Sequence, residues 1–200
     1  MNILKFIYKK IKKMGKILII VDCQNDFIDG TLAVPKATDM IGRLGTFLAK
    51  NAKDYDKIML TADWHPTNHS SFVENNGAWP AHCVQFTQGA AIHNTIINVL
   101  RNAHIDYDIL TKGLKAETEE YSILANENSK KRIIETFDTV KPSEIHVCGI
   151  AGSFCVKNTV EDLVKEGFGD KVNVLLDFVA DFDNSTFKDY LVENKIKFSE

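Results

Sequence analysis

The stretch ILIIVD at residues 17–22 is an apolar, mostly β-branched run that ends on an acid. This pattern predicts a short strand buried on both faces of a sheet. Four later stretches repeat it: IMLT at 58–61, YDILT at 107–111, IHVCG at 145–149 and VNVLL at 172–176. The sequence therefore predicts five buried strands.

Helical periodicity separates these strands. The apolar positions that mark it fall into four groups: Ile41, Leu44, Phe47 and Leu48; Ile92, Ile96, Ile97 and Leu100; Ile133, Ile134 and Phe137; Val156, Val160, Leu163 and Val164. Strands that alternate with helices are typical of a parallel sheet with helices on both faces. We therefore predict a three-layer, doubly wound α/β fold with a mostly parallel sheet, formed by one domain over residues 16–200.

Composition narrows the class of protein. The 200 residues are 44% hydrophobic and 26% charged, as in an ordinary soluble globular protein. A net charge of −3 argues against nucleic acid as a partner, and no apolar run approaches the roughly 18 residues of a membrane span. Four widely spaced cysteines form no CxxC pair and suggest reduced thiols, so we expect a cytoplasmic protein.

Residues 1–15 form a basic N-terminal extension. Residues 1–16 contain six lysines and no acid, with Ile3, Ile7, Ile11 and Met14 on one helical stripe. One interpretation is a weak membrane-surface helix. We favour the other, a frayed extension or sequence ahead of a true start at Met14, and expect no stable membrane association.

The predicted fold indicates where chemistry should occur, because ligands of open α/β sheets bind beyond the carboxyl ends of the strands. Asp22 follows the first strand, and Asp63 and His65 follow the second. Lys112 follows the third strand, and Cys155 comes shortly after the fourth. We therefore expect an acid, a metal-binding pair, a lysine and a cysteine at one edge of the sheet.

The spacing Asp63-x-His65 directs two ligand types to one side of extended backbone, and His82 can supply a third ligand from another loop. Three protein ligands leave open positions, as a catalytic metal site requires. This ligand set suits zinc, iron or manganese. By itself the pattern is weak and is also compatible with a hydrogen-bonded loop. We assign His69 to hydrogen bonding or loop packing in preference to a fourth ligand.

Cys155 stands between a strand and the predicted helix 156–165. A thiol at a helix N-terminus faces the positive end of the dipole, so we expect a lowered thiol pKa. Asp22 can accept the thiol proton, and Lys112 can stabilise negative charge. Each residue also has an alternative interpretation. Cys155 can be a small buried cysteine, Asp22 a helix-capping acid and Lys112 a solvated surface lysine.

Two aromatic residues, Phe27 and Trp79, lie close in sequence to these candidates. They can sandwich a flat ring, since stacking contributes about 0.5–1.5 kcal/mol beyond area burial. Ordinary loop packing is an equally good interpretation.

The segments IIVDCQNDF, TADWHPTNHSSF, WPAHCVQFT, LTKG and HVCGIAGSFCV occur in the order and spacing of the isochorismatase-like cysteine hydrolases. The chain most closely resembles the nicotinamidases (pyrazinamidases) among them, over residues 16–190. The resemblance implies hydrolysis of nicotinamide to nicotinate and ammonia for NAD salvage, with pyrazinamide as a further substrate. It also implies one divalent metal ion, with zinc as first choice and iron or manganese as alternatives.

The resemblance implies a role for each candidate residue. These roles are nucleophile for Cys155, general base for Asp22, third triad member for Lys112, metal ligands for Asp63, His65 and His82, ring contacts for Phe27 and Trp79, and backbone oxyanion donors for Ala151 and Cys155. The family also has a cis peptide bond at the position of Ile150–Ala151.

Two departures from the family pattern leave the substrate open. Gly152-Ser153-Phe154 lacks the acid that many members carry before the cysteine, and Ala81 replaces a proline. Alternatives are therefore a hydrolase of another small amide or N-carbamoyl compound, or a non-catalytic binding protein. The sequence also leaves open a substrate contact by Tyr121 and a homo-oligomer.

Overall fold

The computed structural model describes residues 15–200 and contains a six-stranded sheet with strand order β3-β2-β1-β4-β5-β6. Every neighbouring pair of strands is parallel. The strands are β1 (Gly15–Val21), β2 (Lys57–Asp63), β3 (Tyr107–Lys112), β4 (Pro142–Ile150), β5 (Val172–Ala180) and β6 (Lys197–Ser199). The five predicted strands are confirmed, and β6 is an additional short edge strand.

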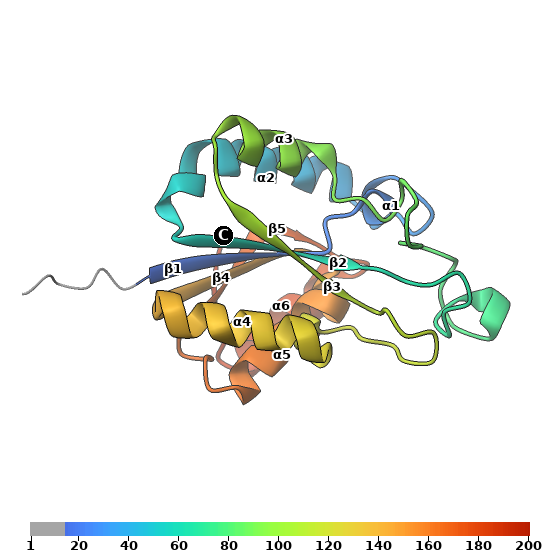
Figure 1. The fold of residues 1–200 in the computed structure, drawn as a ribbon. Coiled ribbons are helices and arrows are strands. Elements are labelled where there is room, and N and C mark those ends of the chain that lie inside the picture. Colours follow the sequence, from blue (N-terminus) through green and yellow to red (C-terminus); the bar gives the residue numbers. More distant parts are fainter. Residues whose placement is uncertain (1–14) are drawn as a thin grey trace, which may run out of the picture.

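Helices cover both faces of this sheet, with α2 and α3 on one side and α4, α5 and α6 on the other (Figure 1). The α-helices are α1 (Asn25–Ile28), α2 (Ala37–Asn51), α3 (Asn94–Asn102), α4 (Glu127–Val140), α5 (Lys157–Lys165) and α6 (Asn184–Glu193). Single 3-10 turns occupy Ala52–Asp54, Val73–Asn75 and Ile123–Ala125, and a π-helical turn occupies Gly152–Val156. The doubly wound α/β fold is confirmed.

The central strand explains why the sheet is covered on both faces. Along β1, Leu18 and Ile20 belong to the core under α2 and α3, whereas Ile17 and Ile19 belong to the core under α4 and α5. Successive side chains of a strand point to opposite faces, so an uninterrupted apolar run requires an apolar partner on each side. The run at residues 17–21 thus places β1 in the middle of the sheet.

The prediction for the basic extension lies outside the described residues, apart from Gly15, with which β1 begins. None of the helices within residues 15–200 combines the length and apolar character that a bilayer crossing requires.

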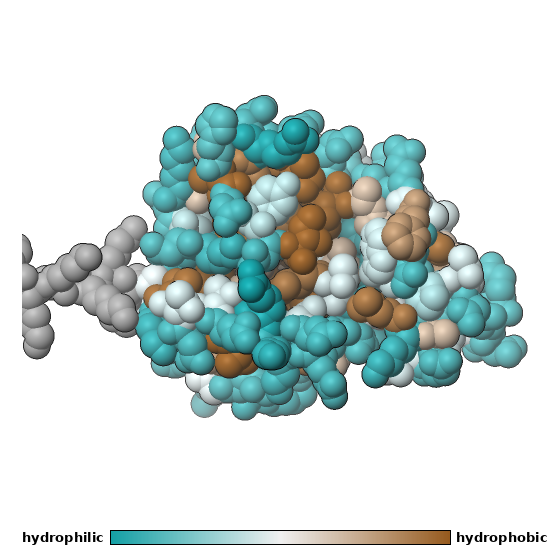
Figure 2. Space-filling view, in the orientation of Figure 1, coloured by the Kyte–Doolittle hydropathy of each residue, from teal (hydrophilic) through white to brown (hydrophobic). Residues whose placement is uncertain are grey.

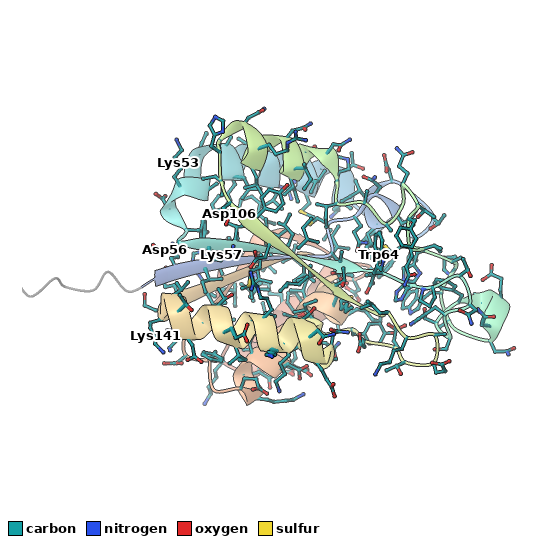
Figure 3. The ribbon with its side chains drawn as sticks, in the orientation of Figure 1. Lys53, Asp56, Lys57, Trp64, Asp106 and Lys141 are labelled. Carbon is teal, nitrogen blue, oxygen red and sulfur yellow. The ribbon has the colours of Figure 1, made fainter. Side chains whose placement is uncertain are left out.

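The strands run from left to right in Figure 1, and their carboxyl ends meet the long loops and α1. Figure 3 shows Trp64 at this end of the molecule, directly after β2, while Lys57 at the start of β2 lies toward the opposite end.

The edge strand β3 faces the viewer in Figure 2, where apolar side chains gather between α3 and α4. Ile109 of β3 is 51% exposed there. The edge strand thus presents apolar surface, whereas the candidate site lies at the carboxyl ends.

Candidate active site

Lys112 forms the centre of the site. Its ammonium is fully buried at the end of β3. Nζ lies 2.5 Å from Asp63 Oδ1, 3.0 Å from Asp22 Oδ2 and 3.4 Å from Cys155 Sγ. Burial lowers the pKa of Lys112, but Asp22 and Asp63 outweigh this effect and hold it well above its usual value. Lys112 is therefore a buried, charged group that joins three reactive side chains, and the alternative of a solvated surface lysine is wrong.

Asp22 directly follows β1 and has a positive φ of 47°. Thr61 fixes its side chain, because the Thr61 hydroxyl donates to Asp22 Oδ1 at 2.5 Å and accepts from the Asp22 N–H at 3.1 Å. Burial raises the pKa of Asp22, although the Lys112 ammonium opposes the shift. A carboxylate with a raised pKa is a better proton acceptor than an exposed aspartate.

Cys155 lies within the π-helical turn Gly152–Val156 that links β4 to α5. Its sulfur and carboxylate oxygens of Asp22 and Asp63 all lie within 4.8 Å of one another. The peptide bond Ile150–Ala151 before this turn is cis, as the family resemblance implies.

The expected lowering of the Cys155 pKa is wrong for this structure. Burial raises the thiol pKa well above its usual value, and the attraction of Lys112 does not offset it. The expectation took only the helix dipole into account, whereas Cys155 is just 6% exposed and loses the solvation that a thiolate needs. The resting group is a thiol that needs a base. The other three cysteines, Cys23, Cys83 and Cys148, are free and buried in the apolar core.

Asp63, His65 and His82 form a cluster that can hold a metal ion, with one ligand atom from each within 4.8 Å of the others. His65 Nδ1 lies 3.1 Å from the Gly113 carbonyl oxygen, and His82 Nδ1 lies 2.8 Å from that of Pro80. Each Nδ1–H therefore donates to a carbonyl, which leaves both Nε2 lone pairs free. The buried His65 Nε2 has no hydrogen-bond partner. These residues fit a divalent metal ion.

Gly113 permits the orientation of His65. It adopts a positive φ of 66°, and a Cβ at this position would lie 2.4 Å from the His65 ring. A larger residue would displace the imidazole from the carbonyl to which it donates. The glycine after Lys112 is thus part of the candidate metal site.

His69 does not join the cluster. Its Nδ1 accepts from the Ser71 N–H at 3.2 Å and contacts the Ser71 hydroxyl at 2.7 Å. Its Nε2 lies 3.1 Å from the Thr118 carbonyl oxygen. With both ring nitrogens engaged, His69 has no lone pair for a metal, in agreement with the assignment to hydrogen bonding.

A pocket of about 350 Å³, including its open mouth, leads from the surface to Cys155, Asp63 and His82. Phe27 and Trp79 both line it, and Tyr121 does too. Ala151 lines the pocket as well, together with four residues that the sequence did not point to, Leu32, Glu119, Phe154 and Phe182. A flat aromatic ligand can stack against the aromatic side chains that line this pocket.

Gln24 is a further residue that sequence reasoning missed. Its amide accepts from the Asp63 N–H at 2.8 Å and donates to the Asp63 carbonyl oxygen at 2.7 Å. It therefore fixes the backbone that carries a metal ligand. The only feature of the sequence that pointed to Gln24 was its position directly after Asp22 and Cys23. A glutamine in a loop does not by itself indicate which residue it will hydrogen-bond.

Comparisons with known proteins agree with this geometry. The pattern of the isochorismatase domain family matches residues 16–195. The chain is 30% identical to a nicotinamidase of Saccharomyces cerevisiae, over 91% of this chain and 94% of that protein. It is 34% identical to a nicotinamidase/pyrazinamidase of Mycobacterium tuberculosis, over 82% and 85%. A pyrazinamidase of Pyrococcus horikoshii in complex with zinc superposes with a TM-score of 0.79 at 29% identity, over 93% and 99%.

Proposed function

The chain belongs to the isochorismatase family, and we propose that it is a metal-containing nicotinamidase of that family. Such an enzyme is an amidohydrolase that converts nicotinamide to nicotinate and ammonia. One observation carries this proposal: the Lys112 ammonium contacts Asp22, Cys155 and Asp63 at the base of an aromatic pocket. The nucleophile, the base and a metal-binding carboxylate thus all contact the Lys112 ammonium, next to a pocket that fits a flat ring.

Proton transfer from Cys155 to Asp22 starts the reaction. Burial raises the pKa of both groups, so the transfer exchanges one buried anion for another. Lys112 touches both groups and keeps a counter-charge beside the anion before and after the transfer. The thiolate then attacks the carboxamide carbon, and the carbonyl electrons move to oxygen.

The backbone N–H groups of Ala151 and Cys155 would hold that oxyanion, since both lie in the segment that positions the sulfur. When the carbon–nitrogen bond breaks, Asp22 returns the proton and ammonia leaves. Water then attacks the thioester, giving nicotinate and restoring the Cys155 thiol. Asp22 therefore acts as a base and then as an acid.

Asp63, His65 and His82 would hold the metal ion, and we propose zinc. When bound, the ion supplies a Lewis acid that can ligate the pyridine nitrogen of the substrate. The Asp63 carboxylate belongs to this metal-binding cluster and also contacts Lys112. It therefore fixes the position of the metal ligands relative to the catalytic triad. Phe27 and Trp79 would flank the ring.

The test is ammonia release from a panel of nicotinamide, pyrazinamide and N-carbamoyl compounds, with and without a chelator. We expect nicotinamide and pyrazinamide to be hydrolysed and a chelator to reduce the rate. Cys155→Ala should abolish turnover, whereas Cys148→Ala, which changes a cysteine in the apolar core, should retain it. Hydrolysis of N-carbamoyl compounds alone would favour the second enzyme class. A folded protein inactive on the entire panel would favour a binding protein.

We further propose that the nicotinate formed by this reaction enters NAD salvage. We also propose that the protein acts in the cytoplasm. The homo-oligomer that the sequence left open stays a prediction, and light scattering of the purified protein would test it.

A further inference from the structure

Asp181 follows β5 directly and is a buried acid that the mechanism above does not use, with 2% of its surface exposed. Its Oδ2 accepts from the Ser153 N–H at 2.8 Å and from the Ser153 hydroxyl at 2.5 Å. Its Oδ1 accepts from the Phe182 N–H at 2.9 Å. One carboxylate thus binds two segments that are far apart in sequence.

The turn is shaped to receive this carboxylate. A Cβ at Gly152 would lie 2.8 Å from Asp181 Oδ2 and 3.0 Å from its Cγ. Only glycine therefore allows the acid to approach Ser153 so closely. A buried carboxylate is costly unless it is hydrogen-bonded, and bonds to a charged acceptor are stronger than neutral ones.

Both segments that Asp181 binds belong to the site. Ser153 lies in the π-helical turn that carries Cys155. Phe182 lines the pocket and stacks on Trp79, with ring centroids 5.8 Å apart and planes inclined by 20°. A substitution at Asp181 would therefore shift both the turn that carries Cys155 and the aromatic side chains, Phe182 and Trp79, that line the pocket.

We propose that Asp181 is a positioning residue, which fixes the nucleophile-bearing turn through Ser153 and the aromatic wall through Phe182. This proposal rests on the proposed function, because it requires Cys155 to be the attacking group. A reacting sulfur displaced by about 1 Å can lower the rate roughly 10²-fold.

The experiment measures kcat and KM of Asp181→Ala, Asp181→Asn, Ser153→Ala and the double variant Asp181→Ala/Ser153→Ala. Labelling of Cys155 counts the active sites in each preparation. We expect kcat of Asp181→Ala to fall by roughly 10²-fold, with KM rising by less than about tenfold. Asp181→Asn keeps one oxygen acceptor and should recover part of the loss. The double variant should be no slower than Asp181→Ala, because the two residues act through the same bonds.

Asp177→Asn is the matched control, since this exposed acid lies on the same strand and should leave kcat unchanged. An unchanged kcat per labelled site in Asp181→Ala and Ser153→Ala would overturn the proposal, even if less protein folds. If Asp181→Ala yields no folded protein, Asp181→Asn and Ser153→Ala decide the same question. A wild-type protein without nicotinamidase activity would instead refute the proposed function.

Discussion

Replacing Lys112 with Met tests the central feature of the site, because it removes a buried charge while keeping most of the side-chain volume. Lys112 is 0% exposed, and the side chains of its partners Asp22 and Asp63 are 0% and 5% exposed. The variant leaves two buried carboxylates without their shared cation. Breaking a buried ion pair costs about 3–5 kcal/mol, so we expect a loss of this size in the free energy of unfolding.

The same substitution should reduce catalysis. Without the ammonium, no cation stabilises the Cys155 thiolate or remains beside Asp22 during proton transfer. Loss of one stabilising group in a buried site costs roughly 10²–10³-fold in rate, so kcat should fall at least this far.

Urea denaturation of metal-free protein at pH 7.5 and pH 5.5 measures the stability effect. In the variant the two carboxylates lose their counter-charge, so their pKa values rise in the folded state above the unfolded values. The folded variant then binds protons more readily as the pH falls, and its deficit should shrink at pH 5.5.

Lys130→Met is the matched control. Lys130 pairs with Glu166 at 2.6 Å, but these side chains are 42% and 31% exposed. We expect a change of about 0–1 kcal/mol at both pH values. A Lys112→Met protein that loses less than about 1 kcal/mol and keeps its turnover would refute the reasoning.

Three further predictions concern the metal, the pocket and the protein's pH stability. Asp63→Ala should reduce the metal content from about one ion per chain to less than about a tenth, whereas His69→Gln should keep it, as measured by elemental analysis; equal metal loss in both variants would contradict the ligand assignment. Trp79→Ala should raise KM for nicotinamide about two- to twelvefold with little change in kcat, since stacking contributes about 0.5–1.5 kcal/mol; Phe86→Ala, at a side chain 90% exposed, is the control. Burial lowers the pKa of His146 from 6.5 to about 4, so the unfolded chain takes up a proton first as the pH falls. Stability should therefore drop by about 1–2 kcal/mol between pH 7 and pH 5, allowing for partial solvent access, and less in His146→Asn; equal drops in urea titrations would argue against this cause.

The order of the elements was predictable because it follows from local pattern. An apolar run such as residues 17–21 has no polar face, so it indicates burial on both sides without reference to the rest of the chain. The last part of the fold was missed. β6 has only three residues and carries no periodic signal, whereas α6 shows Phe187 and Leu191 one helical turn apart, a spacing that could have identified it.

The convergence of the candidate residues was also predictable, because the carboxyl ends of parallel strands share one edge. That rule brings Asp22, Asp63 and Lys112 together from three strands. It does not say how deeply they are buried. The thiol pKa of Cys155 was therefore predicted in the wrong direction, since desolvation depends on every group packed around the sulfur.

The sequence by itself determined the fold class, the edge that holds the site and the residue types that converge there, because these depend on the local order of apolar and polar residues. Only the tertiary structure decided which partners those residues have. Lys112 bridges two acids and a thiol, His65 and His82 each direct Nδ1 to a backbone carbonyl, and Asp181 reaches a turn 28 residues away. Hydrogen bonds and ion pairs act over a few ångströms in space, and chain separation carries no information about such distances.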